Sequence, residues 1–245
     1  MDSGFYAACT ALMSRTQALD AIANNLANAG TTGYRAQRDV FNSVLAAASD
    51  APISALNRAA NDYGILTGTR LDLTQGALEK TGNPLDMAVE GPGFFTVQTA
   101  NGTFYTRNGA FQVSAKGQLV TASGDPVLGD RGPISLMDGS VTISPDGTIS
   151  SAGAVAGKLK IVDFPPGTAL ESVGNSYYSA PSSSEGVANQ FNIRQGMLES
   201  SNVNPVAGMV ELITVQRSAE MMQRALSMFS SEMDKTATQD LPKVG

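Results

Sequence analysis

The chain has 245 residues, which fits one large domain or two small ones because domains usually hold about 100 to 200 residues. Apolar residues make up 42% of the sequence and charged residues 16%, a balance that excludes a disordered acidic chain. The net charge of −6 would repel a phosphate backbone, so we expect no nucleic-acid partner. No run of about 18 apolar residues occurs, so we expect no direct membrane span.

The residue types that are missing exclude most enzyme mechanisms. Histidine is absent, so the chain cannot build a Ser-His-Asp triad or an imidazole general base. Cys9 is the only cysteine, which excludes an internal disulfide and multi-cysteine metal sites. The stretch from Gly153 to Leu159 lacks both the glycine spacing and the hydroxyl residue of a phosphate-binding loop. We expect no catalytic residue, no metal and no bound cofactor.

The first thirty residues do not read as a secretion signal. Asp2 stands where such a signal would be basic, and Arg15 and Asp20 interrupt the stretch that would have to be apolar. These residues favour a cytoplasmic protein, or one exported by a route that uses no cleaved signal.

Both ends of the chain have helical periodicity. Apolar residues at steps of three and four predict a helix from about 5 to 28, which Asn28 and Gly30 would end. A second helix should start at Asn204-Pro205, since proline is favoured in a first helical turn. Its apolar positions alternate steps of three and four over three heptads, a pattern typical of a helix packed along another helix. They are Leu212, Val215, Ala219, Met222, Leu226, Phe229 and Met233.

The middle of the chain has short β-type runs separated by turn dipeptides such as Asn101-Gly102 and Asp146-Gly147, which predicts antiparallel hairpins. We expect an α+β fold in which the N- and C-terminal helices pack against each other as a coiled-coil pair. The residues between them in the sequence should form a central all-β domain of hairpins. The expected segments are an N-terminal polymerisation helix at 1–30, an extended connector at 31–80, the β domain at 81–197 and a C-terminal polymerisation helix at 198–245. The predicted strands are 94–98, 103–106, 111–114, 118–121, 141–144, 148–150, 159–163 and 191–194, and the aromatic residues predicted to be core are Phe94, Phe95, Tyr105 and Phe111.

Several motifs are similar to those of one bacterial family. They are Ala23-Asn24-Asn25-Leu26-Ala27-Asn28 with Thr31-Thr32-Gly33-Tyr34-Arg35 near the N-terminus, Gly91-Pro92-Gly93-Phe94-Phe95 with Tyr105-Thr106-Arg107-Asn108-Gly109-Ala110-Phe111 in the middle, and Leu198-Glu199-Ser200-Ser201-Asn202-Val203-Asn204 with Ile213-Thr214-Val215-Gln216-Arg217 near the C-terminus. With these motifs, which cover nearly the whole chain, the sequence resembles the bacterial flagellar rod and hook axial proteins.

Within this family the proximal-rod type fits better than the distal-rod type. Met1-Asp2, the stretch from Gly33 to Gln37 and Pro84-Leu85-Asp86 favour the proximal type, whereas Asp39-Val40-Phe41 favours the distal one. The connector from Ala46 to Asp62 matches neither type well.

The resemblance implies a structural, non-enzymatic subunit of the flagellar basal-body rod in the periplasm. It also implies export through the flagellar type III apparatus and assembly with other rod proteins, and with further copies of itself, through the terminal helices. We predict that the assembly interface consists of Leu12, Leu19, Ile22, Asn24, Asn25, Leu26, Asn28, Leu212, Val215, Met222, Leu226 and Phe229. The apolar members would drive association, and the asparagines would fix helix ends or register through hydrogen bonds.

Three alternatives remain at this point. The chain could be a distal-rod or hook-type member of the same family. It could be a rod-associated peptidoglycan hydrolase that uses two carboxylates, but Asp125, Asp130, Asp138 and Asp146 all stand in turn contexts that explain an aspartate locally. A surface adhesion module is the third possibility. The role of Arg107, as a loop anchor or a contact with a neighbour, stays open.

Overall fold

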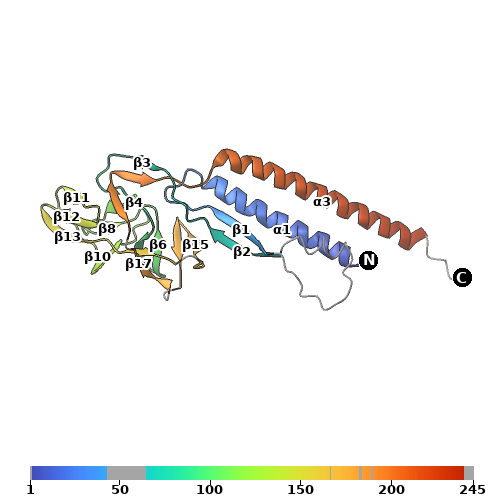
Figure 1. The fold of residues 1–245 in the computed structure, drawn as a ribbon, viewed down its shortest axis with the longest axis horizontal. Coiled ribbons are helices and arrows are strands. Elements are labelled where there is room, and N and C mark those ends of the chain that lie inside the picture. The colour runs from blue at the N-terminus through green and yellow to red at the C-terminus, as the bar shows by residue number, and fades with distance from the viewer. Residues whose placement is uncertain (1, 43–64, 166, 182–183, 189, 240–245) are drawn as a thin grey trace. The chain divides into compact units, whose positions relative to one another are not determined.

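The computed structural model describes residues 2–42, 65–165, 167–181, 184–188 and 190–239. A β-rich region lies in the sequence between two long helices, α1 (Asp2–Ala27) and α3 (Pro205–Gln239) (Figure 1). Contacts divide the chain into two compact units. The helical unit comprises the described residues within Met1–Ala27, Gln37–Thr69 and Asn204–Gly245, and the β unit comprises those within Asn28–Ala36 and Arg70–Val203.

In the helical unit α1 and α3 contact each other along their lengths. Strand β1 (Gln37–Asn42) pairs with β2 (Ile65–Leu71) and contacts α1. Helix α3 starts where predicted: Asn204 Oδ1 accepts hydrogen bonds from the amides of Val206 and Ala207 at 3.1 Å each and so caps the helix. Over the described residues, neither helix has an apolar stretch that could span a bilayer. The connector stretch from Ala46 to Asp62 lies outside the described residues, which resume at Ile65 with β2.

The β unit consists of antiparallel pairs, as the turn dipeptides predict. Its largest sheet has six strands in the order β15 (Glu171–Gly174), β16 (Tyr177–Ser179), β6 (Gly102–Thr106), β5 (Phe94–Thr99), β14 (Ile161–Asp163) and β17 (Gly186–Val187). A three-stranded sheet contains β11 (Val141–Ile143), β12 (Thr148–Ser151) and β13 (Ala154–Lys158). The remaining pairs are β18 (Asn192–Gln195) with β4 (Met87–Glu90), β19 (Met197–Glu199) with β3 (Leu78–Lys80), β7 (Gln112–Val113) with β8 (Leu119–Val120), and β9 (Leu128–Gly129) with β10 (Gly132–Pro133).

Within the predicted connector 31–80 the described residues form β1, β2 and β3. Residues 28–36 and 70–80 belong to the β unit. In the second of these stretches, β3 pairs with β19, which lies near the C-terminal end of that unit in the sequence. The β unit is therefore assembled from two stretches of the sequence, 28–36 and 70–203, which the residues of β1 and most of β2 separate.

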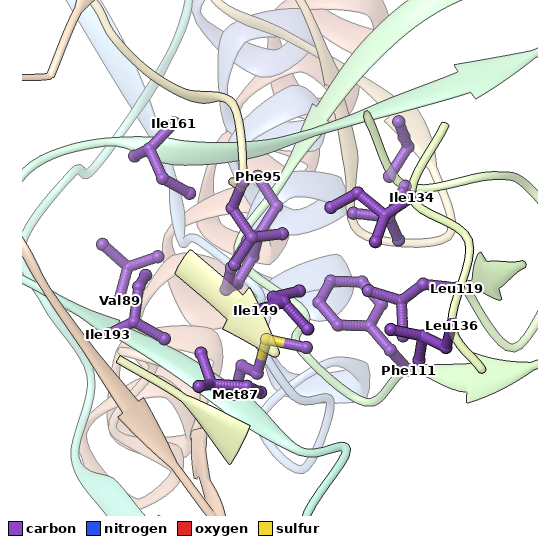
Figure 2. Close-up of a cluster of buried hydrophobic side chains, with 14 of the residues drawn as sticks. Met87, Val89, Phe95, Phe111, Leu119, Ile134, Leu136, Ile149, Ile161 and Ile193 are labelled. Atoms are coloured by element: carbon purple, nitrogen blue, oxygen red, sulfur yellow. The ribbon is translucent and has the colours of Figure 1, made fainter. Parts of the chain in front are cut away.

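The six-stranded sheet buries side chains on both faces, because neighbouring residues of a strand point to opposite sides. Phe95 and Ile161 belong to the larger apolar cluster, in which Phe95 also packs edge-on against Phe111 with ring centroids 5.1 Å apart (Figure 2). Phe94 and Tyr178 belong to a smaller cluster, together with Tyr105. All four predicted core aromatics are buried, which confirms that part of the prediction.

Candidate functional site

The predicted assembly residues of α1 differ in burial. Ile22 is buried, Leu12, Leu19 and Leu26 are half-buried, and Asn24 is exposed. Ala18 and Ala21 are buried beside Ile22, so this side of α1 is the side that the helical unit covers. Small alanines allow a neighbouring helix to approach closely.

Helix α3 carries apolar side chains on two opposite sides. Successive residues of an α-helix are about 100° apart, so Leu212, Val215, Met222 and Leu226 fall on one side, all half-buried, with Ala219 fully buried between them. We call these five residues the inner face. Phe229, the remaining predicted residue, lies on α3, but its side chain is not among those described.

The opposite side of α3 is apolar as well, which the heptad analysis missed. Six large side chains there are each more than half exposed, and their positions fall within an arc of about 120°. This outer face consists of Val206, Met209, Val210, Ile213, Met221 and Met228. Arg224 and Glu220 lie on the same side of the helix and pair with each other at 3.6 Å. The signal that could have found it is a second apolar series at steps of three, one and three residues, formed by Val206, Met209, Val210 and Ile213.

Two of the predicted asparagines have side-chain hydrogen bonds at the end of α1. Asn25 Nδ2 donates to the carbonyl of Gln37 at 2.7 Å, and its Oδ1 accepts from the Gln37 amide at 2.8 Å, so Asn25 joins α1 to the start of β1. Asn28 Oδ1 accepts from the hydroxyl of Thr31 at 3.2 Å, and the Asn28 carbonyl accepts from the Thr31 amide at 3.1 Å. These contacts fix local geometry inside one chain.

A buried ionic cluster lies in the β unit, built from all three motif regions. Glu199, from β19, is fully buried, and its Oε1 lies 2.6 Å from Arg35 Nη2. Its Oε2 accepts from Arg107 Nη1 at 3.2 Å, and Oε1 also accepts from the amide of Gly76 at 2.8 Å. Removing one partner of a buried ion pair typically costs about 3–5 kcal/mol, so this carboxylate is held strongly in place.

Arg107 is an anchor inside the β unit. Its Nη1 donates to the carbonyl of Val89 at 3.0 Å and its Nη2 to that of Gly91 at 2.7 Å, while the guanidinium lies 5.1 Å from the ring centroid of Phe94. Burial lowers the pKa of Arg107 to about 10; Glu199 opposes that shift and Arg35 adds to it. Two guanidinium groups thus share one carboxylate, and the cluster carries a net positive charge.

Asn202 joins the same chain segments a few residues further on. Its Oδ1 accepts from the Ala36 amide at 2.7 Å, and its Nδ2 donates to the carbonyls of Asp72 at 2.8 Å and Thr74 at 3.0 Å. The Asp72 amide in turn donates to the Ala36 carbonyl at 2.8 Å. We call Glu199 and Asn202, with the atoms they bind, the root clamp.

The sequence contained the residues of the root clamp without showing their partnership. Arg35, Arg107, Glu199 and Asn202 all stand inside the motifs quoted above, in a chain with few charges. Charged residues in otherwise uncharged motifs were the available signal, but pairing over more than 60 positions is not readable from spacing.

Two of the four turn carboxylates accept hydrogen bonds within the β unit, one from a distant residue and one from a local neighbour. Asp125 Oδ2 accepts from the hydroxyl of Tyr177 at 2.8 Å, and Asp146 accepts from the amide and hydroxyl of Thr148, which lower the pKa of Asp146. Among the residues that the structure describes, no group of three or more His, Cys, Asp or Glu is placed to hold a metal ion.

Comparisons with known proteins agree with the motifs. Three family models match: "Flagella basal body rod protein" at residues 5–35, "Flagellar hook protein FlgE/F/G D1 domain" at 88–151 and "Flagellar basal body rod FlgEFG protein C-terminal" at 194–240. The chain is 33% identical to the flagellar basal-body rod protein FlgF of Caulobacter vibrioides over 100% of both chains. It is 34% identical to FlgF of Escherichia coli over 93% of this chain and 94% of that one.

The chain belongs to the flagellar rod protein family. Within the family both rod types match it: the flagellar basal-body rod protein FlgG of Buchnera aphidicola is 31% identical over 89% of this chain and 92% of its own. The N-terminal family region contains most of α1 and the C-terminal one contains all of α3, and each includes residues of the root clamp or their partners.

Proposed function

We propose that the chain is a structural, non-enzymatic subunit of the flagellar basal-body rod, of the proximal FlgF type, that transmits torque. The observation that carries this proposal is the pair of opposite apolar sides on α3. The relatives that match the chain over all or nearly all of their length are named rod proteins. One side serves the chain itself, and the other is available to a neighbour.

In this proposal α1 and α3 pair as a coiled coil through the inner face. Support comes from the heptad spacing, from the contact between the two helices, and from the buried Ile22 and Ala219 on their respective sides. The residues predicted as an assembly interface on these sides would then stabilise the subunit first, since burial of one large aliphatic side chain is worth roughly 1.5–3 kcal/mol.

The outer face is the surface that would meet neighbouring axial subunits. Six exposed apolar side chains lie on this side of the helix, with Arg217, Glu220 and Arg224 among them, and exposed apolar side chains that gather on one side typically mark an interaction surface. The exposed side of α1 carries mainly polar residues, Gln17, Asp20 and Asn24, next to the exposed Met13. A contact that joins unlike surfaces grows as an open helical array when the rotation between subunits does not close a ring, and such an array is what a rod requires.

The partners in this proposal are other flagellar rod proteins and further copies of the chain, in the periplasmic part of the basal body. Export would use the flagellar type III apparatus. Support for these finer statements comes from the family.

Adjacent residues on opposite sides of α3 test the proposal. Ile213→Asp should leave helix content and unfolding temperature of the purified protein unchanged and should prevent its recovery in isolated basal bodies. Leu212→Asp, and equally Leu226→Asp, should reduce helix content because a charge enters the half-buried inner face. Gln223→Asp, at an exposed position beside both faces, is the matched control and should assemble normally.

Motility and cell fractionation complete the test. Cells that carry Ile213→Asp as their only copy should not swim, whereas the Gln223→Asp strain should. Recovery of the Ile213→Asp protein in basal bodies at the wild-type level would overturn the assignment of the outer face. Absence of the unmodified protein from basal bodies would overturn the proposed function itself.

A further inference from the structure

The chain passes between the β unit and the helical unit at four points. These are after Ala27, after Ala36, after Thr69 and after Val203. Three segments of the β unit lead to those points: 28–36, which lies between two of them, the segment that begins at Arg70, and the segment that ends at Val203. Any force carried along the chain from the helical unit enters the β unit through these three segments.

The root clamp joins all three segments inside the β unit. Glu199 contacts Arg35 of the first segment and the Gly76 amide of the second, and its own carbonyl accepts from the Gly33 amide at 2.7 Å. Asn202 contacts Ala36 of the first segment and Asp72 of the second. Arg107 then connects Glu199 to β4 through the carbonyl of Val89, within the core of the unit.

The contacts of the root clamp leave little space for movement. A Cβ atom at Gly33 would overlap the backbone of Asn108, and one at Gly76 would overlap the carbonyl of Ser200. The backbones therefore lie directly against one another at both positions. Arg35 and Glu199 are fully buried, so water cannot take over the role of either partner without a local opening of the unit.

We infer that Glu199 and Asn202 are positioning residues that join the three segments named above (28–36, the one that begins at Arg70 and the one that ends at Val203) into one stiff element. A force that enters the β unit through one segment is then shared by the other two. This role deepens the proposed function, on which its mechanical part rests. The carboxylate is the central element because it alone contacts Arg35, Arg107 and the Gly76 amide. Asn202 adds a second, uncharged tie between the same segments.

Hydrogen exchange on the full-length protein tests the coupling without any assumption about function. In Glu199→Gln both guanidinium groups lose the negative charge that they share, and in Asn202→Ala the Ala36 amide loses its acceptor. Exchange in both variants should accelerate about tenfold or more at 33–36 and 72–76 together. Strands β5 and β6 should keep the wild-type rate. Glu90→Gln, which removes an exposed ion pair with Arg194 at 2.7 Å, is the matched control and should change neither region.

Each result supports or overturns the inference. Faster exchange in only the mutated segment would show that the segments are not coupled, and faster exchange throughout the β unit would show a general stabilising role. Either result would overturn the inference.

The swimming speed of cells tests the mechanical part of the inference. Strains with Glu199→Gln or Asn202→Ala should form rods but lose swimming speed steeply as the viscosity of the medium rises, whereas the Glu90→Gln strain should follow the wild type. Wild-type speed at high viscosity would overturn the mechanical role, and absence of the unmodified protein from rods would overturn the proposed function while the exchange result stands.

Discussion

Tyr178 offers a sensitive test of how the root clamp is packed into the β unit. Its side chain is fully buried beside Phe94, its hydroxyl accepts from the Arg35 amide at 2.8 Å, and it donates to the Gly33 carbonyl at 3.4 Å. Burial raises the pKa of Tyr178 from 10.0 to about 12, although the Arg35 amide and guanidinium oppose that shift. We predict that Tyr178→Phe makes the protein less stable at neutral pH and less sensitive to alkali.

The sign and size of this effect follow from proton linkage. The folded pKa lies above the unfolded one, so the contribution of Tyr178 is fully present below pH 10 and is lost as the pH rises through about 12. A difference of two pKa units corresponds to about 3 kcal/mol. At neutral pH the substitution leaves the Arg35 amide without its acceptor, which should cost about 1–3 kcal/mol. The two proteins should therefore approach equal stability in strong alkali.

Urea unfolding measured at a series of pH values from about 8 to about 11.5 checks this prediction. The free energy of unfolding of the wild type should fall steeply above pH 10, and that of Tyr178→Phe should fall less. Tyrosinate absorbance gives an independent count, because the variant should lose one late-titrating group. Parallel pH curves for the two proteins, or a Tyr178 that titrates near pH 10 in the folded state, would refute the reasoning.

Three further outcomes are expected. Gly33→Ala should destabilise the β unit by several kcal/mol, because Gly33 has φ +69° and a methyl group there meets the backbone of Asn108; thermal unfolding measures it. Phe95→Ala should cost about 3–5 kcal/mol in urea unfolding, since the side chain is fully buried, and a loss below 1 kcal/mol would contradict the packing. A hydrogen bond from the Tyr105 hydroxyl lowers the pKa of Glu185 in the folded state. The stability that this carboxylate contributes above pH 4.5 should therefore be lost as the pH falls. In Glu185→Gln the free energy of unfolding, measured in urea at a series of acid pH values, should fall less.

The elements governed by local rules were predictable from the sequence. The period of α1 and the cap at Asn204 placed both helices to within a few residues, and Asn-Gly and Asp-Gly turns placed the hairpins β5–β6 and β11–β12. Local signals suffice there because the partners are close in the chain.

Long-range pairs were not predictable in the same way. Strands β3 and β4 pair with β19 and β18, more than 100 residues away, and nothing in a four-residue strand specifies so distant a partner. The heptad reading found the inner face of α3 and overlooked the outer one, because a single best period assigns one apolar side. The salt bridges of Glu199 were unpredictable for the same reason as the distant strands.

The root clamp also acts as a check on the completeness of the chain. Arg35 and Arg107 are made long before Glu199 during synthesis, and within the β unit that carboxylate is their shared counter-charge. A fragment that stopped short of it would have to bury Arg35 and Arg107 without that carboxylate or leave its core open to water and proteases. We therefore expect such fragments to be cleaved by proteases as unfolded protein.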